Sequence, residues 1–231
     1  NNMAEIETKV ISNEDYNFLR KRMMRLEESY KQSNDQTVRK AVRDKTLFDI
    51  CERFPDFLYD YGDAFECCAM SSLKEITDLF DSVMGRYSIE PLPRIQSEKD
   101  VKRLLKLKDK ALKTFIKGYN DAVATHNLTY YSQRIDDKLV FLTVQDGEFV
   151  GAATDVSRSQ RNGECLCHVC RKFKRGGDIT FVTNTAKTTK GEYSSLGQTI
   201  CSDYESCNRE VEDREPLVKF LRYKLDKERE R

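Results

Sequence analysis

Apolar residues at three- and four-residue steps mark the first ninety residues of the chain as helical. Polar and acidic residues suited to a first turn follow Ser12, and one apolar stripe then runs through Tyr16, Leu19, Met23, Leu26 and Tyr30. Further helices are predicted over about 36–53 and 56–70, and from Ser72, which forms a capping-box pattern with Glu75. The second should bury Val38, Val42, Phe48 and Ile50. We therefore expect an antiparallel helical bundle domain over residues 1–90.

The pattern changes after Pro91 and Pro93, which prevent helix and mark a linker. A basic helix is predicted over 97–118, and β-branched and aromatic residues then predict strands over 138–144 and 149–156, joined by an Asp146-Gly147 turn. A third strand is expected over 178–183, a polar loop over 184–198, and a final helix after Asp213 with Pro216 in its first turn. The fold class is thus α+β, with an α/β domain over 91–231.

Composition and charge support two domains with different surfaces. The chain has 231 residues, 39% of them hydrophobic, which is enough to fill cores. Residues 1–90 carry a net charge of −5 and residues 91–231 a net charge of +6. No apolar stretch is long enough to span a bilayer, and no secretion signal is evident at the start. We expect a cytoplasmic protein without a membrane partner.

The eight cysteines include two close pairs in the C-terminal part of the chain. Cys167 and Cys170 are separated by two residues, and Cys201 and Cys207 by five. In a reducing compartment, paired spacing of this kind favours a tetrahedral metal site over disulfides. Four thiolates fill all positions around one Zn²⁺, so the predicted ion is structural rather than catalytic. The zinc lobe is expected to cover about 157–231, and its fold should depend on the metal.

The remaining cysteines and the nearby histidine have less specific interpretations. Cys165 offers a competing ligand, but the two-residue gap to Cys170 favours Cys167. His168 lies between two ligands and is expected to point toward solvent. Cys51, Cys67 and Cys68 lie on predicted helices and are expected to fill the core of the bundle.

In its order of elements and its cysteine spacing, the chain resembles the FusB-type fusidic acid resistance proteins, which bind elongation factor G. The resemblance spans about Tyr16 to Leu225 and is most specific at the two cysteine pairs and the helix that contains Phe220. It implies a helical N-terminal domain, an α/β domain with a treble-clef-like zinc finger, and one structural Zn²⁺ held by Cys167, Cys170, Cys201 and Cys207. It also implies non-enzymatic binding of elongation factor G and its release from drug-stalled ribosomes.

The resemblance also suggests which residues contact the partner. Phe220 matches an aromatic residue of the family implicated in gripping the factor. A Lys, a Tyr and an aromatic residue used elsewhere in the family are replaced here by Leu196, Thr199 and Leu166. Either the 184–198 segment is realigned, so that Lys190 and Tyr193 take over these contacts, or this chain binds the factor differently. The basic residues after Cys170 complete the predicted contact set: Arg171, Lys172, Lys174 and Arg175.

Two other classes of function compete with protein binding. An enzyme is disfavoured, because the chain lacks the phosphate loop, nucleophile elbow and metalloprotease motifs and has only two histidines, His126 and His168. No small-molecule substrate is expected. The stronger alternative is a zinc-finger protein that binds RNA or the ribosome, through the 97–118 helix and the cations of 158–175, which include Arg158 and Arg161. Weak contact with ribosomal RNA is also compatible with the first interpretation.

Overall fold

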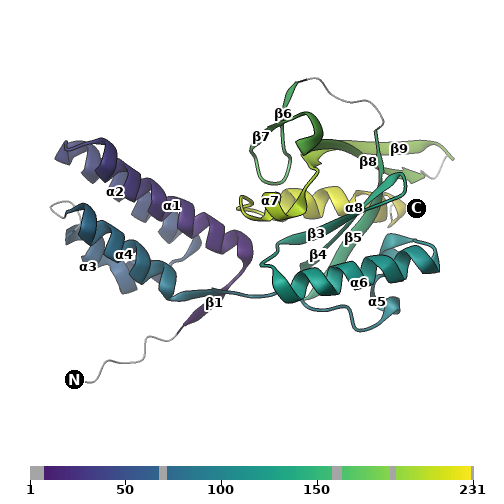
Figure 1. Ribbon diagram of the computed structural model, residues 1–231, viewed down its shortest axis with the longest axis horizontal. Coiled ribbons are helices and arrows are strands. Elements are labelled where there is room, and N and C mark those ends of the chain that lie inside the picture. Colours follow the sequence, from purple (N-terminus) through teal and green to yellow (C-terminus); the bar gives the residue numbers. More distant parts are fainter. Residues whose placement is uncertain (1–7, 68–71, 158–162, 188–190, 230–231) are drawn as a thin grey trace. The chain divides into compact units, whose positions relative to one another are not determined.

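The computed structural model describes residues 8–67, 72–157, 163–187 and 191–229. The chain divides into two compact units (Figure 1). The N-terminal unit comprises Asn1–Ile11 and Asp15–Ile89, and the C-terminal unit comprises Ser12–Glu14 and Glu90–Arg231. No helix in the described ranges combines the length and the apolar content that crossing a membrane requires.

The N-terminal unit is built from four helices and one small sheet. Its helices are α1 (Asn13–Gln32), α2 (Gln36–Arg53), α3 (Phe57–Cys67) and α4 (Leu73–Gly85). The expected capping box is present, since Ser72 accepts a hydrogen bond from the Glu75 amide and Glu75 accepts one from the Ser72 amide. The apolar stripe of α1 is buried as expected at Leu19, Met23 and Leu26. On α2, however, Val38 and Phe48 are exposed, while Thr46 and Ile50 face the core.

The sequence did not predict the short parallel sheet of this unit. Strand β1 (Lys9–Ile11) pairs with β2 (Tyr87–Ile89), so the two ends of the unit lie side by side. Asp60 on α3 anchors both ends, with a carboxylate oxygen 3.0 Å from Lys9 Nζ and 3.2 Å from the Arg86 guanidinium. The hydrogen bond from Lys9 is the largest cause that lowers the pKa of Asp60.

The C-terminal unit is a five-stranded antiparallel sheet with helices on both faces. Its strand order is β3-β4-β5-β8-β9, formed by Tyr130–Ile135, Lys138–Gln145, Glu148–Val156, Ile179–Lys187 and Tyr193–Cys201. A separate hairpin joins β6 (Glu164–Leu166) to β7 (Phe173–Arg175), and a 3₁₀ turn covers Gly176–Asp178. The helices are α5 (Glu98–Leu105), α6 (Asp109–Thr125), α7 (Tyr204–Asn208) and α8 (Glu215–Arg229).

Alternation along β4 creates two cores, one on each face of the sheet. Leu139 and Phe141 pack with α8 and the four paired cysteines, whereas Val140 and Leu142 pack with α5 and α6. Figure 1 shows α6 and α8 on opposite sides of the central strands. The expected combination of an N-terminal helical region and a β-rich C-terminal domain with four clustered cysteines is confirmed.

Of three local predictions for this unit, the hairpin is present, the basic helix is interrupted and the polar loop is wrong. The β4–β5 hairpin is present, and Asp146 and Gly147 both have the positive φ angles (52° and 79°) of its two-residue turn. The predicted 97–118 helix is interrupted, because Lys106 adopts a left-handed backbone conformation (φ 51°) that ends α5. The loop prediction over 184–198 is wrong for the described residues: β8 and β9 form nine consecutive pairs, from Ile179–Cys201 to Lys187–Tyr193.

Candidate metal centre and the adjacent hairpin

Four buried cysteine sulfurs converge on one point in the C-terminal unit. Their Sγ atoms all lie within 4.8 Å of one another. Cys167 lies 3.9 Å from Cys207, and Cys170 lies 3.6 Å from Cys201, measured between sulfurs. The four residues come from a turn after β6, the last position of β9 and the helix α7. The cluster therefore closes a long loop of the chain.

Local backbone geometry places the first pair. After Cys167 the chain turns back, so that the Arg171 amide donates to the Cys167 carbonyl (3.0 Å) and the Cys167 amide donates to the Lys172 carbonyl (2.9 Å). Arg171 is left-handed, with φ 59°. On the other side, Asp203 caps α7 by accepting from the Glu205 and Ser206 amides, which fixes the helix that carries Cys207.

The donor set and its spacing fit a tetrahedral metal ion. Zinc–sulfur bonds of about 2.3 Å in a tetrahedron place neighbouring sulfurs about 3.8 Å apart, and the Cys170–Cys201 and Cys167–Cys207 separations of 3.6 and 3.9 Å lie on either side of that value. A backbone amide, Cys201 N–H, also points at Cys167 Sγ over 3.4 Å, as amides do around sulfur ligands. The four cysteines are thus positioned to bind one metal ion.

The pKa shifts show that the four thiols compete for negative charge. The hydrogen bond with Cys170 is the largest cause that lowers the pKa of Cys167, whereas the hydrogen bond with Cys167 is the largest that raises the pKa of Cys207. Without a cation, negative charge on some sulfurs of the cluster disfavours ionisation of the others, and the pKa values of Cys201 and Cys207 are raised. A divalent ion would remove this conflict, because metal ligation favours the thiolate form.

The other cysteines and His168 lie outside the cluster. Cys165 is half-buried on β6 and packs against the core, but its sulfur is not part of the group. His168 is half-buried, and its Nε2 lies 3.3 Å from the Pro216 carbonyl oxygen, so the solvent-facing expectation is wrong. In the N-terminal unit Cys51 is half-buried, while Cys67 is exposed and does not fill the core. Cys68 lies outside the described residues.

Beside the cluster, the β6–β7 hairpin presents an aromatic residue that the sequence analysis missed. Phe173 pairs directly with Leu166, so their side chains share one face of the hairpin. That face is open: Phe173 is 64% exposed and Leu166 is 38% exposed. The opposite face carries Cys165 and the half-buried Lys174. A signal was available in the sequence, because Phe173 alternates with Lys172 and Lys174 just after the first cysteine pair.

The four predicted cations surround this apolar pair in the chain. Lys172 lies 3.8 Å from Glu210, and Arg175 lies 3.4 Å from its cross-strand neighbour Glu164. These are exposed, loosely held ion pairs of the kind that contributes little to stability. Among the described acids, none lies within ion-pairing distance of Arg171 or Lys174. The structure thus places Arg171, Lys172, Lys174 and Arg175 around the Phe173 hairpin.

The other predicted contact residues lie elsewhere. Tyr193 is 73% exposed, but it begins β9, whereas the hairpin lies near the other end of that strand, where Thr199 Oγ1 donates to the Leu166 carbonyl. Phe220 is only 1% exposed and packs edge-on against Phe141 at 6.5 Å, so its side chain is part of the core and offers no surface. Lys190, Arg158 and Arg161 lie outside the described residues.

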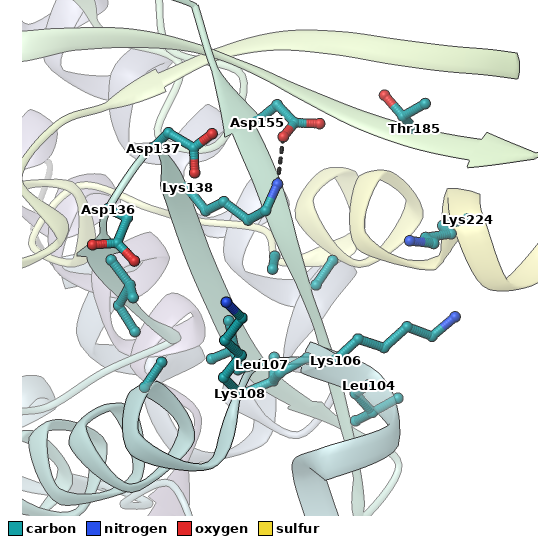
Figure 2. Close-up of a pocket in the computed structure, with 15 residues that line it drawn as sticks. Leu104, Lys106, Leu107, Lys108, Asp136, Asp137, Lys138, Asp155, Thr185 and Lys224 are labelled. Atoms are coloured by element: carbon teal, nitrogen blue, oxygen red, sulfur yellow. Dashed lines mark hydrogen bonds and ion pairs between the residues drawn. The ribbon is translucent and has the colours of Figure 1, made fainter.

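A cavity of about 410 Å³ lies where β5 and β8 separate (Figure 2). Within the described part of the chain these strands pair at Asp155–Thr183 and Val156–Val182, and Ala152 and Thr185, beyond the first of these pairs, line the cavity. The floor is apolar, and Figure 2 shows Asp136 and Asp137 at one side and Lys106 and Lys224 at the other. Lys138 lies 2.5 Å from Asp155, and Lys106 lies 3.3 Å from Glu228. The positive and negative charges that line the cavity are therefore close to balanced, whereas those of the β6–β7 hairpin are mainly positive.

Comparison with known proteins gives two matching family models. Residues 10–61 match the N-terminal model of elongation factor G-binding proteins, and residues 121–231 match the FBP C-terminal treble-clef zinc finger. The second match covers all four clustered cysteines and the Phe173 hairpin.

A solved structure and the curated proteins complete the comparison. The solved structure of the fusidic acid resistance protein FusC is similar to the structure of this chain. The TM-score is 0.62, and the match covers 94% of this chain and 98% of that one. At 17% sequence identity this likeness shows the fold. No curated protein has a significantly similar sequence. Together, the two models show an elongation factor G-binding N-terminal domain over residues 10–61 and a treble-clef zinc-finger domain over residues 121–231, and the four clustered sulfurs lie in the second.

Proposed function

We propose that this protein binds elongation factor G and promotes its release from ribosomes stalled by fusidic acid, without modifying the drug. The observation that carries the proposal is the pair of family matches, one to an elongation factor G-binding domain and one to the zinc finger. The likeness to the fold of a fusidic acid resistance protein supports it. In this proposal Cys167, Cys170, Cys201 and Cys207 hold one structural Zn²⁺, and the protein acts in the cytoplasm.

The Phe173 hairpin is the surface we assign to the partner. An exposed aromatic residue flanked by arginine and lysine has the composition of an interface hot spot. Leu166 extends the apolar centre, and the surrounding cations favour encounter with an acidic protein. Tyr193 and Lys190 remain candidate outer contacts. Phe220 is not assigned to this surface, because its side chain is buried in the core.

The proposed mechanism is a shift of a conformational equilibrium. A binder that prefers the off-ribosome conformation of the factor draws it away from the stalled complex, by as much as its affinity differs between the two conformations. No bond is made or broken in this process, so no catalytic group is required. The zinc ion serves to hold the hairpin in shape, since four protein ligands leave it no open coordination position.

The test is binding of purified elongation factor G to the full-length zinc-loaded protein, measured by calorimetry at moderate salt. Phe173→Ala should weaken binding at least tenfold, the scale of an interface hot spot. Tyr193→Ala, which truncates an equally exposed aromatic residue at the far end of β9, is the matched comparison and should have a smaller effect. Both variants should keep the melting temperature of the parent protein.

The same proteins distinguish the RNA-binding alternative. Sedimentation of drug-stalled ribosomes should show release of the factor by the parent protein and reduced release by Phe173→Ala. If the protein binds ribosomal RNA with steep salt dependence and shows no affinity for the factor, the alternative is correct. If Phe173→Ala binds the factor as tightly as the parent, the hairpin is not the contact surface.

A further inference from the structure

A tyrosine hydroxyl is buried without a partner in the core that contains the metal centre. Tyr130, the first residue of β3, is fully buried, and its hydroxyl has no hydrogen-bond partner among the described residues. Its side chain belongs to the same core as the four clustered cysteines and lies 6.0 Å from the Phe141 ring, centroid to centroid. Burying a hydroxyl that makes no hydrogen bond is unfavourable, so this group calls for a partner.

Backbone contacts bind Tyr130 to the segment that carries the fourth cysteine. Asn208, the residue after Cys207, accepts from the Tyr130 amide through Oδ1 (3.2 Å) and donates to the Tyr130 carbonyl through Nδ2 (2.8 Å). The same Nδ2 donates to the Tyr204 carbonyl within α7 (2.8 Å). Asn208 is itself buried, so this clamp is shielded from water. The start of β3 is thereby held against the end of α7.

A metal-bound thiolate would supply the hydrogen-bond acceptor that the Tyr130 hydroxyl lacks. Four thiolates around a divalent zinc ion leave a net charge of −2, which is stabilised by N–H and O–H groups that donate to sulfur. The Cys201 amide already points at Cys167 Sγ in this way. A neutral thiol is a weak acceptor for a hydroxyl, whereas a metal-bound thiolate is a strong one.

We propose that the Tyr130 hydroxyl donates a hydrogen bond to the metal-bound thiolate of Cys207 and so acts as a positioning residue for the zinc centre. The Asn208 clamp holds Tyr130 against the residue that follows Cys207, and the unpartnered hydroxyl lies in the same core as the four sulfurs. The proposal concerns the metal centre alone. Its test does not involve elongation factor G and can fail independently of the proposed function.

The test compares two deletions of a buried hydroxyl from the same strand. Tyr130→Phe removes the proposed donor, and Ser132→Ala removes another buried hydroxyl without a partner, two residues along β3 on the same face. Zinc affinity is measured on the full chain by competition with a chromophoric chelator. Tyr130→Phe should bind zinc about tenfold more weakly, the lower end of the effect of outer-shell partners, whereas Ser132→Ala should bind it as the parent does.

Two further measurements separate a hydrogen bond to sulfur from a packing effect. In the Co²⁺-substituted protein, Tyr130→Phe should shift the sulfur-to-metal charge-transfer band, and Ser132→Ala should not. In the ¹¹³Cd-substituted parent protein, the Tyr130 hydroxyl proton should appear as a slowly exchanging signal coupled to the metal, which requires no variant. Unchanged zinc affinity in a folded Tyr130→Phe protein, equal weakening in both variants, or the absence of the coupled proton would overturn the proposal.

Discussion

Two phenylalanines of the C-terminal unit have opposite environments, although each follows a lysine in the sequence. Phe220 is flanked by Lys219 on α8, yet it lies in the core beside Phe141. Phe173 lies between Lys172 and Lys174, and its ring is open to solvent. The difference arises from the element that carries each residue: a helix face turned to the sheet, or the outer face of a hairpin.

This contrast leads to a prediction for stability. Phe220→Ala should lower the free energy of unfolding by about 3–5 kcal/mol, because it leaves a cavity in the core. Phe173→Ala should change it by no more than about 0.5 kcal/mol, as is usual for an exposed side chain. Urea unfolding followed by tyrosine fluorescence measures both, since the chain has no tryptophan. Equal destabilisation by the two substitutions would contradict the assigned environments.

Arg171 combines a strained backbone with a candidate contact side chain. A left-handed conformation costs a non-glycine residue about 1–2 kcal/mol, and Arg171 adopts it in the turn after Cys170. Arg171→Gly should therefore preserve the melting temperature, whereas Arg171→Val should lower it, since a β-branched residue tolerates this conformation poorly. Thermal unfolding of the two zinc-loaded variants gives the comparison. A valine variant as stable as the glycine variant would show that the turn is not strained.

At the scale of elements, the close approach of paired backbones determines where a strand has room for a side chain larger than that of glycine. A Cβ atom on Gly151 of β5 would lie 2.6 Å from the Phe141 carbonyl oxygen of β4, the strand to which it pairs. That contact is with backbone, which has little freedom to move within a paired sheet. A Cβ atom on Gly177, in the 3₁₀ turn before β8, would meet no atom of the described residues within 4 Å.

The two glycines give a matched pair of substitutions in one unit. Gly151→Ala should destabilise the C-terminal unit by about 1–3 kcal/mol through overpacking, whereas Gly177→Ala should be close to neutral. Melting temperatures of the zinc-loaded proteins, followed by circular dichroism in the β-sheet region, measure the effect. If Gly151→Ala melted with the parent protein, the β4–β5 pairing would have to be looser than the structure shows.

Elements stabilised by interactions between residues close in the sequence could be predicted. Elements stabilised by pairing with distant segments could not. The Asp146-Gly147 turn and the Ser72 capping box depend on adjacent residues, and both are present. Strand β9 reads as a polar loop because it contains Ser194, Ser195 and Gly197, yet it pairs along its full length with β8. The cysteine cluster was predictable because its spacing is local within each pair. The open face of Phe173 was not, because it depends on the pairing of β6 with β7.

For the whole molecule, the metal centre is part of the core of the C-terminal unit. The four cysteines pack in the same core as Phe141, Leu217 and Phe220, which joins the sheet to α8. The N-terminal unit has its own separate core, built around Leu19, Met23 and Leu26. Loss of the ion should therefore affect the two units differently.

Removal of zinc should unfold the C-terminal unit and leave the helical unit intact. Structural zinc contributes on the order of 10–16 kcal/mol of apparent binding free energy in small fingers, comparable to the stability of a domain. Hydrogen exchange of the chelator-treated full chain should show loss of protection along β3–β9 and retained protection in α1–α4. Unchanged protection across both units after verified loss of the metal would refute this expectation.

Single cysteine substitutions provide the control for this experiment. Cys201→Ser removes a sulfur of the cluster and should reproduce the effect of chelation, whereas Cys165→Ser, just outside the cluster, should retain one zinc ion per chain. Elemental analysis of the purified proteins measures the content directly. Loss of zinc from the Cys165→Ser protein would identify Cys165 as a ligand.

The two faces of the β6–β7 hairpin have a consequence for how relatives can diverge. Leu166 and Phe173 lie on the exposed face of the hairpin, while Cys165 and Lys174 lie on the opposite face. If the hairpin is the contact surface that we propose, substitutions on its outer face would change the preference for a partner without affecting the metal centre. Across related sequences, the positions of Leu166 and Phe173 should then vary together with the surface of the translation factor that each protein binds. The four clustered cysteines and Tyr130 should be conserved.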